Sequence, residues 1–327
     1  MSFDRAALVA AVAARGRVTR VVIADLRGSS PREVGAAMLV WDGPNGPGQS
    51  GTIGGGALEF AAAQAARTQQ VDSQLSRHAL GPDLGQCCGG SVVLLSELYD
   101  AARLQTLGHD VIARPVVAAE VGAAAGVATG AEMPLRLRRL TDLARARGER
   151  PEPQLIDGWM VEPVSRPTRQ IWLWGAGHVG RAIAQVLAPL PDLAITWVDT
   201  APDRFPADPP AGVTVVPAAS PAELVRHAPT EAEHLILTYS HVLDLDLCHR
   251  LLSHGFGFAG LIGSATKWAR FRSRLAALGH APDSIARITC PIGQPGLGKH
   301  PQQIAIGVAT QILQRAAGVE TDMRDRA

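Results

Sequence analysis

The stretch from residue 170 to 199 constrains the fold more than any other part of the chain. QIWLW at 170–174 is a short apolar run typical of a buried strand, and GAGHVG follows it directly, before the helical pattern RAIAQVLAPL. A second apolar run, AITWV, then ends at Asp199. A glycine-rich turn between a strand and a helix, with an acid about 20 residues further on, is the fingerprint of a Rossmann unit.

The rest of the C-terminal half continues this alternation of strands and helices. Further short apolar runs lie at 212–218, 234–239 and 256–263, with helical patterns between them. Strands that alternate with helices form a parallel sheet covered on both faces. We therefore predict an α/β protein whose C-terminal domain is Rossmann-like, with a doubly wound parallel sheet.

The N-terminal half has a different pattern, in which strands follow one another with a single long helix among them. Strands are expected at 16–28, 34–41, 73–80, 91–98 and 155–164, with a loop around Pro44 to Gly48 and a helix at 57–69. This order predicts a mixed α+β domain. Pro163 and Pro167 mark the join, so the expected domains are 1–166 and 167–327.

Composition excludes several classes of protein. Hydrophobic residues make up 46% and charged residues 19% of the 327 residues, which is typical of a globular chain. A net charge of +1 gives no field that would attract nucleic acid or an anionic membrane. Four sparse and unevenly spaced cysteines, together with a start that lacks a signal-peptide pattern, favour the reducing cytoplasm. The blandest apolar stretch, 116–131, contains Glu120 and several glycines and should not span a bilayer.

The GAGHVG turn is the first candidate binding site. Gly175, Gly177 and Gly180 would let backbone N–H groups, including that of His178, approach a phosphate at the helix start. Asp199 stands where a Rossmann fold places its ribose-binding acid. A tight turn without any ligand would need the same glycines, but the strand–turn–helix context favours phosphate binding.

A second anion site is expected at the same edge of the sheet. Ser264 follows a strand and should cap the next helix, and Lys267 lies in its first turn. His241 ends another strand, in TYSH, and is expected to face the cleft. A solvated basic helix face is the alternative for Lys267. A zinc site at this edge is not expected, because the acidic and histidine residues after His241 fall on different helix faces.

Two stretches of the N-terminal half are also candidates. GTIGGG at 51–56 is a run of main-chain donors at a helix start, in which Gly54 and Gly55 could hold a phosphate or could form a plain flexible turn. LGPDLGQCCGG at 80–90 sets Cys87 and Cys88 side by side on glycine-rich backbone. No base stands at an obvious spacing, the segment has too few thiolates for structural zinc, and a disulfide between neighbours is strained. What remains is a soft, accessible sulfur ligand on a glycine platform, suited to a soft metal or to sulfur chemistry.

Taken together, seven stretches of the chain resemble the XdhC/CoxI family, the accessory proteins of xanthine dehydrogenase and related molybdenum hydroxylases. They are GSSPREVGAAMLV, GTIGGGALE, LGPDLGQCCGG, WLWGAGHVGRAIAQVL, TYSH-x-LDLDLC, GLIGSATKWARFRSRL and CPIGQPGLGKHPQQIAIGVATQIL. They run in order from residue 28 to 313. GQCCGG together with GKHP is similar to the xanthine dehydrogenase branch of the family.

The resemblance implies a chaperone that binds the molybdenum cofactor, in its molybdopterin form, rather than an enzyme with catalytic residues. It would hold the cofactor while a cysteine desulfurase replaces a terminal oxygen by sulfur, and then insert it into the molybdenum-binding subunit of apo xanthine dehydrogenase. Proteins of cofactor biosynthesis are further implied partners, and a homodimer is expected. Cys88 and Cys87 would lie near the metal, and the glycine turns, Ser264 and Lys267 would anchor the phosphate.

Three rival functions remain open from the sequence. An NAD-dependent oxidoreductase would use the same Rossmann fingerprint, although no catalytic dyad for a substrate presents itself. A purely protein-binding adaptor would carry the fold without a ligand. Sulfur transfer through a persulfide on Cys88 would make the chain a catalyst of the sulfuration step itself.

Overall fold

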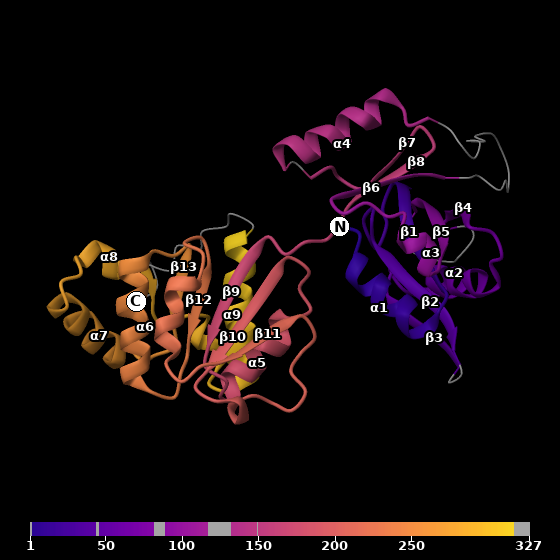
Figure 1. The fold of residues 1–327 in the computed structure, drawn as a ribbon. Helices are drawn as coiled ribbons and strands as arrows, with labels where there is room; N and C mark the ends of the chain where they lie inside the picture. Colours follow the sequence, from indigo (N-terminus) through magenta and orange to yellow (C-terminus); the bar gives the residue numbers. More distant parts are fainter. Residues whose placement is uncertain (1, 44–45, 82–88, 117–131, 149, 317–327) are drawn as a thin grey trace. The chain divides into compact units, whose positions relative to one another are not determined.

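The computed structural model describes residues 2–43, 46–81, 89–116, 132–148 and 150–316 (Figure 1). The chain divides into two compact units, unit 1 from Met1 to Ser165 and unit 2 from Arg166 to Ala327. Each is described here by itself. Among the described residues, no helix combines the length and the apolar character that a membrane crossing needs. Cys87 and Cys88 lie outside the described residues.

Unit 2 is built on a parallel sheet of six short strands. They are β9 (Arg169–Trp174), β10 (Leu193–Asp199), β11 (Val213–Pro217), β12 (Glu233–Ile236), β13 (Phe258–Leu261) and β14 (Ile288–Thr289). Their order is β11-β10-β9-β12-β13-β14, so β9 lies between strands that come later in the chain on both sides. This is the strand order of dinucleotide-binding Rossmann folds, and it confirms the fold class predicted for the C-terminal domain.

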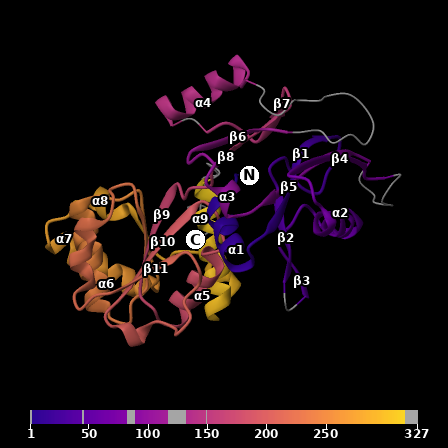
Figure 2. The same cartoon turned by 45° about the vertical axis from the view of Figure 1, so that its right-hand side comes forward.

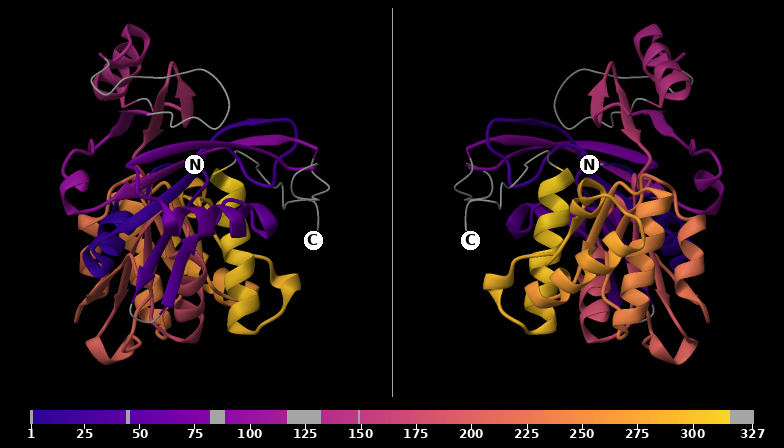
Figure 3. Two further views of the ribbon diagram at one scale, coloured as in Figure 1. Left: turned by 90° about the vertical axis from the view of Figure 1, so that its right-hand side faces the viewer. Right: turned by 90° about the vertical axis from the view of Figure 1, so that its left-hand side faces the viewer.

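Helices cover both faces of this sheet (Figure 2). On one face lie α5 (His178–Leu187) and α9 (Pro301–Ala316), whose apolar side chains pack on Ile171, Leu173 and Leu235. On the other face lie α6 (His241–His254), α7 (Ala265–Ala277) and α8 (Pro282–Ala286). Figure 3 shows the same two helical layers from the sides. The two apolar clusters are separated by the sheet itself.

Unit 1 contains a five-stranded antiparallel sheet. Its strands are β1 (Val18–Arg27), β2 (Ala37–Gly43), β3 (Gly46–Gly51), β4 (Ser73–Ala79) and β5 (Ser91–Tyr99), in the order β3-β2-β1-β5-β4. Helix α2 (Gly56–Thr68) packs Leu58, Ala62 and Ala66 on one face of the sheet, which includes Val21 and Ile23. Helix α1 (Arg5–Arg15) and the short α3 (Ala101–Leu104) bury Leu8, Val12 and Leu104 around Tyr99.

The opposite face of this sheet packs on a second, smaller sheet. Val22, which alternates with Val21 and Ile23 along β1, lies in one cluster with Leu95 and Met160. The small sheet has the order β6-β8-β7, with β6 (Val111–Pro115), β7 (Gln154–Ile156) and β8 (Trp159–Pro163). Helix α4 (Leu135–Arg147) covers it through Leu137. These elements are the mixed α+β part of the predicted fold class.

Two local expectations for unit 1 were wrong. Residues 154–163 form a hairpin rather than one strand, because Asp157 and Gly158 have φ values of 48° and 74° and turn the chain tightly. The expected loop after Pro44 includes a strand, β3, that pairs with β2 from Met38 to Gly43. A strand rich in glycine and containing Pro47 is tolerated there, because β3 lies at the edge of the sheet.

Candidate functional site

A pocket of about 340 Å³ lies at the carboxyl edge of the parallel sheet in unit 2. It is lined by Val179, Leu237, Thr238, Tyr239, His241, Ile262, Gly263, Ser264 and Lys267. These residues follow the ends of β9, β12 and β13, on either side of the point where the strand order reverses. Open α/β sheets bind their ligands at this point. Three predicted site residues, His241, Ser264 and Lys267, are thus brought together from two separate stretches of sequence.

The glycine turn approaches the pocket from β9. Gly175 has a φ of +118°, and a Cβ there would meet the carbonyl oxygen of Leu237 at 2.5 Å. At Gly180 a Cβ would overlap the carbonyl oxygen of Gly175, so both glycines are needed for the close approach of helix and strands. A Cβ on Gly177 would meet open space. Gly177 is the N-cap residue of α5 and provides no side-chain cap. In the first turn of the helix, His178 is exposed and Val179 lines the pocket.

Asp199 is placed differently from the expected ribose-binding acid. Its carboxylate is buried, and Oδ2 accepts a hydrogen bond from the Ala176 N–H at 2.5 Å. Oδ1 accepts from the Thr200 N–H at 2.6 Å and lies 3.5 Å from Nε of Arg204. Both carboxylate oxygens therefore already have protein partners that fix the glycine turn. Ribose binding by Asp199 stays a prediction, and a ribose would have to compete with these contacts.

Lys267 belongs to a buried ion pair at the base of the pocket. Its Nζ donates to Oδ2 of Asp244 at 2.6 Å and to the carbonyl oxygen of Ile262 at 3.0 Å. Asp244 is fully buried, and its Oδ1 accepts from the N–H and the hydroxyl of Thr238 at 3.0 and 2.7 Å. An ammonium group has three donors, so one N–H of Lys267 remains beyond these two bonds. Ser264 caps α7 by accepting from the Lys267 N–H at 3.2 Å.

Sequence reasoning missed Asp244, because it was considered only as part of a zinc cluster. A carboxylate at the fourth position of a helix that follows a strand edge can reach back to the strand end, and this signal could have found it. His241 lines the pocket, but as the first residue of α6 rather than as the end of a strand. Its ring packs edge-to-face on Phe271, with centroids 6.4 Å apart.

Two further thiols lie near this site and were not predicted as part of it. The Sγ of Cys290 lies 3.8 Å from the carbonyl oxygen of Gly263, which lines the pocket. Burial raises the pKa of Cys290 to about 11, although Lys267 opposes the shift. Burial also raises the pKa of Cys248, and Asp244 adds to that shift. Both thiols are therefore protonated near neutral pH, which makes them poor nucleophiles.

The GTIGGG turn of unit 1 already holds an anion, the carboxylate of Glu59. Oε2 of Glu59 accepts from the hydroxyl of Thr52 at 2.5 Å, the N–H of Ile53 at 2.9 Å and the N–H of Gly55 at 3.0 Å. The Gly54 N–H donates to the hydroxyl of Thr52. Cofactor binding by Gly54 and Gly55 stays a prediction, and it would require Glu59 to leave these donors.

The described ends of the cysteine segment are tightly packed. Leu80 donates its N–H to the carbonyl oxygen of Gly90 at 2.9 Å. A Cβ on Gly90 would overlap the carbonyl oxygen of Ser29, whereas a Cβ on Gly89 would meet open space, so Gly90 alone of this pair lets this strand end approach the turn at 28–30. The structure therefore explains Gly90 as a packing requirement of unit 1.

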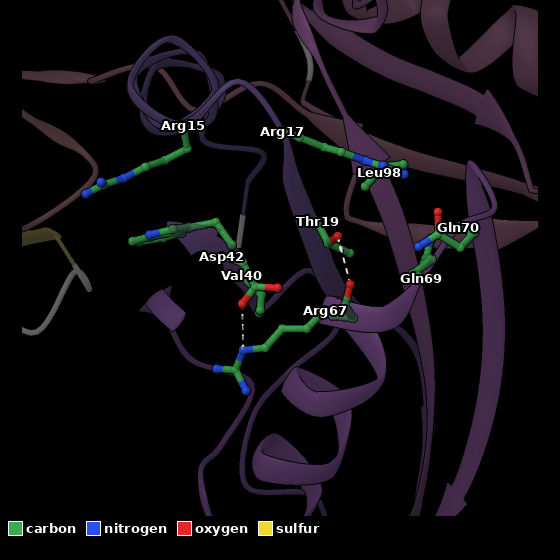
Figure 4. A pocket seen from close by; sticks show the side chains of 11 residues that line it. Arg15, Arg17, Thr19, Val40, Asp42, Arg67, Gln69, Gln70 and Leu98 are labelled. Atoms are coloured by element: carbon green, nitrogen blue, oxygen red, sulfur yellow. Dashed lines mark hydrogen bonds and ion pairs between the residues drawn. The ribbon is translucent and has the colours of Figure 1, made fainter. Parts of the chain in front are cut away.

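A second pocket, of about 220 Å³, lies in unit 1 (Figure 4). It is lined by side chains that include Arg15, Arg17, Arg67 and Asp42. Arg67 forms an ion pair with Asp42 at 3.8 Å. Arg15 and Arg17 extend in different directions in Figure 4, so the three guanidinium groups do not converge on one point. These guanidinium groups therefore do not form a single cationic cluster.

Comparisons with known proteins agree with the fold and the motifs. A model of the XdhC and CoxI family matches residues 11–77, and a model of the XdhC Rossmann domain matches residues 171–312. The uncharacterized protein YqeB of Escherichia coli K12 is 32% identical over 146 residues, which are 43% of this chain and 26% of that relative. The aligned part thus spans about a quarter of the relative's length.

A solved structure has the same fold along the whole chain. It is a Bacillus halodurans protein described as a xanthine dehydrogenase, with 20% sequence identity, a TM-score of 0.67 and coverage of 98% of both chains. The two family models lie on the two units of this structure, one on each, and together cover most of the sequence. This chain belongs to the XdhC and CoxI family.

Proposed function

We propose that this chain is a maturation factor for xanthine dehydrogenase that carries the molybdenum cofactor as its cargo. Membership of the XdhC and CoxI family supports a role beside that enzyme. The observation that carries the binding proposal is the pocket of unit 2, in which a cation, a helix start and apolar side chains meet at the ligand-binding edge of the sheet. The cargo is a phosphorylated pterin that carries a metal, so its phosphoryl group suits the cation and the helix start, and its pterin ring suits the apolar side chains.

The phosphoryl end of the cargo binds at the start of α7. The remaining N–H of Lys267, the Ser264 hydroxyl and the first amides of the helix supply donors and positive potential there. Asp244 keeps the ammonium in place rather than cancelling its use, because the lysine still has one donor to offer. His241 and the start of α5 provide further polar contacts on the other side of the pocket.

The thiols of Cys88 and Cys87 serve the metal-bearing end, as soft ligands or as the point at which sulfur is exchanged. In this proposal the chain holds the cargo while a cysteine desulfurase sulfurates it, and then delivers it to the molybdenum-binding subunit of apo xanthine dehydrogenase. Proteins of cofactor biosynthesis supply the cargo, and the chain acts in the cytoplasm as a homodimer.

The test is anaerobic incubation of the full chain with molybdenum cofactor, followed by desalting and measurement of bound molybdenum per chain. Wild type should retain molybdenum, and Lys267→Ala should lower the affinity by about tenfold or more, because it removes a charge-assisted contact. Arg274→Ala, an exposed position on the same helix, is the matched charge control. Wild type that retains no molybdenum would contradict the proposal.

The cysteines are tested in the same experiment. Cys88→Ala that loses molybdenum would indicate ligation, whereas Cys88→Ala that keeps molybdenum but gains no sulfido ligand would indicate sulfur transfer. Cys87→Ala, measured in the same way, tests whether the second thiol contributes to molybdenum retention or to sulfuration.

The Rossmann strand order also favours a second candidate, an NAD-dependent oxidoreductase. The bonds from Ala176 and Thr200 to Asp199 weigh against it, because the acid that should bind the ribose is engaged. Calorimetric titration with NAD and NADP separates the two functions, and micromolar affinity would favour the oxidoreductase.

A further inference from the structure

An exposed aromatic ring stands at the rim of the unit 2 pocket. Tyr239 follows β12, lines the pocket and is 68% exposed. Val242, three residues later in the first turn of α6, is 75% exposed. Large side chains exposed together beside a cavity are typical of surfaces that contact a ligand. Tyr239 belongs to neither of the two apolar clusters described for unit 2.

A guanidinium group holds this ring from one side. The Cζ of Arg204 lies 5.0 Å from the centroid of the Tyr239 ring, within the range of a cation–π contact. Arg204 is not among the residues that line the pocket, so the guanidinium does not stand between the ring and the cavity. Tyr239 therefore contacts Arg204 through its ring and also lines the cavity.

Arg204 is in turn tied to the glycine turn. Its Nε lies 3.5 Å from Oδ1 of Asp199, and its carbonyl oxygen accepts from Nη2 of Arg181 at 2.7 Å. Arg181 also donates to the carbonyl oxygen of Ala176 at 3.1 Å, and Ala176 donates its N–H to Asp199. The acid expected to bind a ribose thus supports the arginine that supports the tyrosine. These contacts fix Tyr239 relative to the start of α5.

The other walls of the pocket define what lies opposite the ring. Val179, Leu237 and Ile262 supply apolar surface, and Lys267 with Ser264 supplies the anion-binding end. A ligand that fits has a flat body with one anionic end. We propose that Tyr239, positioned by Arg204, stacks on a planar heteroaromatic ring of the ligand whose phosphoryl group binds at Lys267. This inference rests on the proposed function and adds the side chain that recognises the ring.

The experiment uses the full chain and three probes: neopterin monophosphate, neopterin and inorganic phosphate. Quenching of pterin fluorescence measures binding of the first two, and calorimetry measures binding of phosphate. We expect neopterin monophosphate to bind more tightly than either of the others. Tyr239→Ala should weaken it by about tenfold, the size of a stacking contact, whereas Tyr239→Phe should keep most of the affinity.

The positioning role of Arg204 has its own readout. Arg204→Ala should lower the affinity for neopterin monophosphate. It should leave the affinity for inorganic phosphate unchanged, because Lys267 is intact. Lys267→Ala should weaken both. Phe60→Ala, an exposed aromatic in unit 1, and Arg274→Ala are the matched controls, and neither should change binding.

Four outcomes overturn the inference: no binding of neopterin monophosphate to wild type, equal affinity in wild type and Tyr239→Ala, equal affinity for inorganic phosphate, or a loss of phosphate affinity in Arg204→Ala. Guanosine monophosphate, as a fourth probe, distinguishes the sources of the ring. If it binds as well as the pterin and responds to Tyr239→Ala, ring stacking holds and a nucleotide becomes the cargo. Molybdenum retention tests the proposed function separately, because it is measured on wild type and needs no substitution at Tyr239.

Discussion

In unit 1 four buried charged side chains pair with one another, whereas unit 2 buries a neutral histidine as well as an ion pair. Arg20 and Arg114 both bond Glu162, at 2.7 and 2.6 Å, and Arg114 also bonds Glu97 at 2.6 Å. These four residues join the five-stranded sheet to β6 and β8 of the small sheet. The charges thus connect the two sheets of unit 1 and have no pocket beside them among the described cavities.

Unit 2 buries an imidazole among indoles instead. His234 is fully buried on β12, stacks on Trp174 with centroids 6.0 Å apart and accepts a hydrogen bond from the Trp174 Nε1–H at 3.2 Å. Its buried ion pair, Asp244 with Lys267, lies at the pocket. The difference teaches that buried ion pairs connect two sheets in one unit and hold the proposed ligand-binding cation at a pocket in the other.

The largest expected effect comes from breaking the network of unit 1. Glu162→Gln leaves two buried guanidinium groups with a neutral partner, which should lower the free energy of unfolding by about 3–5 kcal/mol. Denaturant unfolding combined with hydrogen exchange should show the loss in unit 1 alone. Glu33→Gln, which breaks an exposed pair with Arg32, is the control and should cost about 1 kcal/mol or less. An equally small effect at Glu162 would contradict the comparison.

A somewhat smaller effect is expected at the ion pair of unit 2. Asp244→Asn should destabilise unit 2 by about 3 kcal/mol, because Lys267 keeps its charge in a largely buried place without its counter-ion. It should also change anion binding, which no variant of the unit 1 network should do. Asp246→Asn on the same helix breaks a half-exposed pair with Arg250 and should alter stability by about 0.5 kcal/mol. Unaltered anion binding in Asp244→Asn would show that the pair is purely structural.

Acidification should separate the two units in a defined order. Burial, with a smaller contribution from His254, lowers the pKa of His234 to about 3. A histidine in the unfolded chain titrates near 6.5, so between these values only the unfolded chain binds the proton, and stability falls as the pH falls. At pH 5 the free energy of unfolding of unit 2 should be lower by about 2 kcal/mol than at neutral pH.

Unit 1 should respond only at lower pH. Burial alone would raise the pKa of Glu162, but Arg20 and Arg114 hold it below 4.5. The contribution of Glu162 to the free energy of unfolding is therefore present above pH 4.5 and is lost as the pH falls further. Unit 2 should therefore weaken first, from about pH 6.5, as hydrogen exchange at several pH values can measure. His234→Asn should flatten that dependence and His227→Gln, an exposed position, should not. Simultaneous weakening of both units above pH 5 would contradict this order.

Five of the six strands of the parallel sheet were predictable because each is a short apolar run, whereas β14, which is two residues long, was not predicted. The rule that carboxyl ends of parallel strands meet at one edge also predicted that His241, Ser264 and Lys267 come together. The turn at Asp157–Gly158 carried a hairpin signal, but apolar alternation through it favoured one strand.

Contacts between side chains set the limit of sequence reasoning. The partners of Asp199 and Glu59, both carboxylates that fill donor sites of their own turns, follow from the path of the backbone in three dimensions. The same holds for Asp244 and for the exposure of Tyr239, neither of which any periodicity encodes. Cys87 and Cys88, the most distinctive pair in the sequence, lie outside the described residues, so their role stays a prediction.

The smallest expected effect contrasts the two glycine turns. In unit 1 the turn is filled by Glu59, whose partial burial would raise its pKa but whose bonds from Thr52, Ile53 and Gly55 lower it overall. In unit 2 Asp199 accepts from the Ala176 N–H of the turn, and the start of α5 after Gly177 has no side-chain cap. Glu59→Ala should therefore destabilise unit 1 by about 1–2 kcal/mol and free its donors for an outside anion.

Inorganic phosphate provides the measurement. In the Glu59→Ala variant, phosphate should raise the stability of unit 1 by up to about 1 kcal/mol at concentrations several times its dissociation constant. In wild type, phosphate should act only on unit 2, and Glu33→Gln is the control because it removes a carboxylate that bonds no glycine turn. Stabilisation of unit 1 by phosphate in wild type would mean that Glu59 yields its place readily. The GTIGGG turn would then be an anion site in its own right.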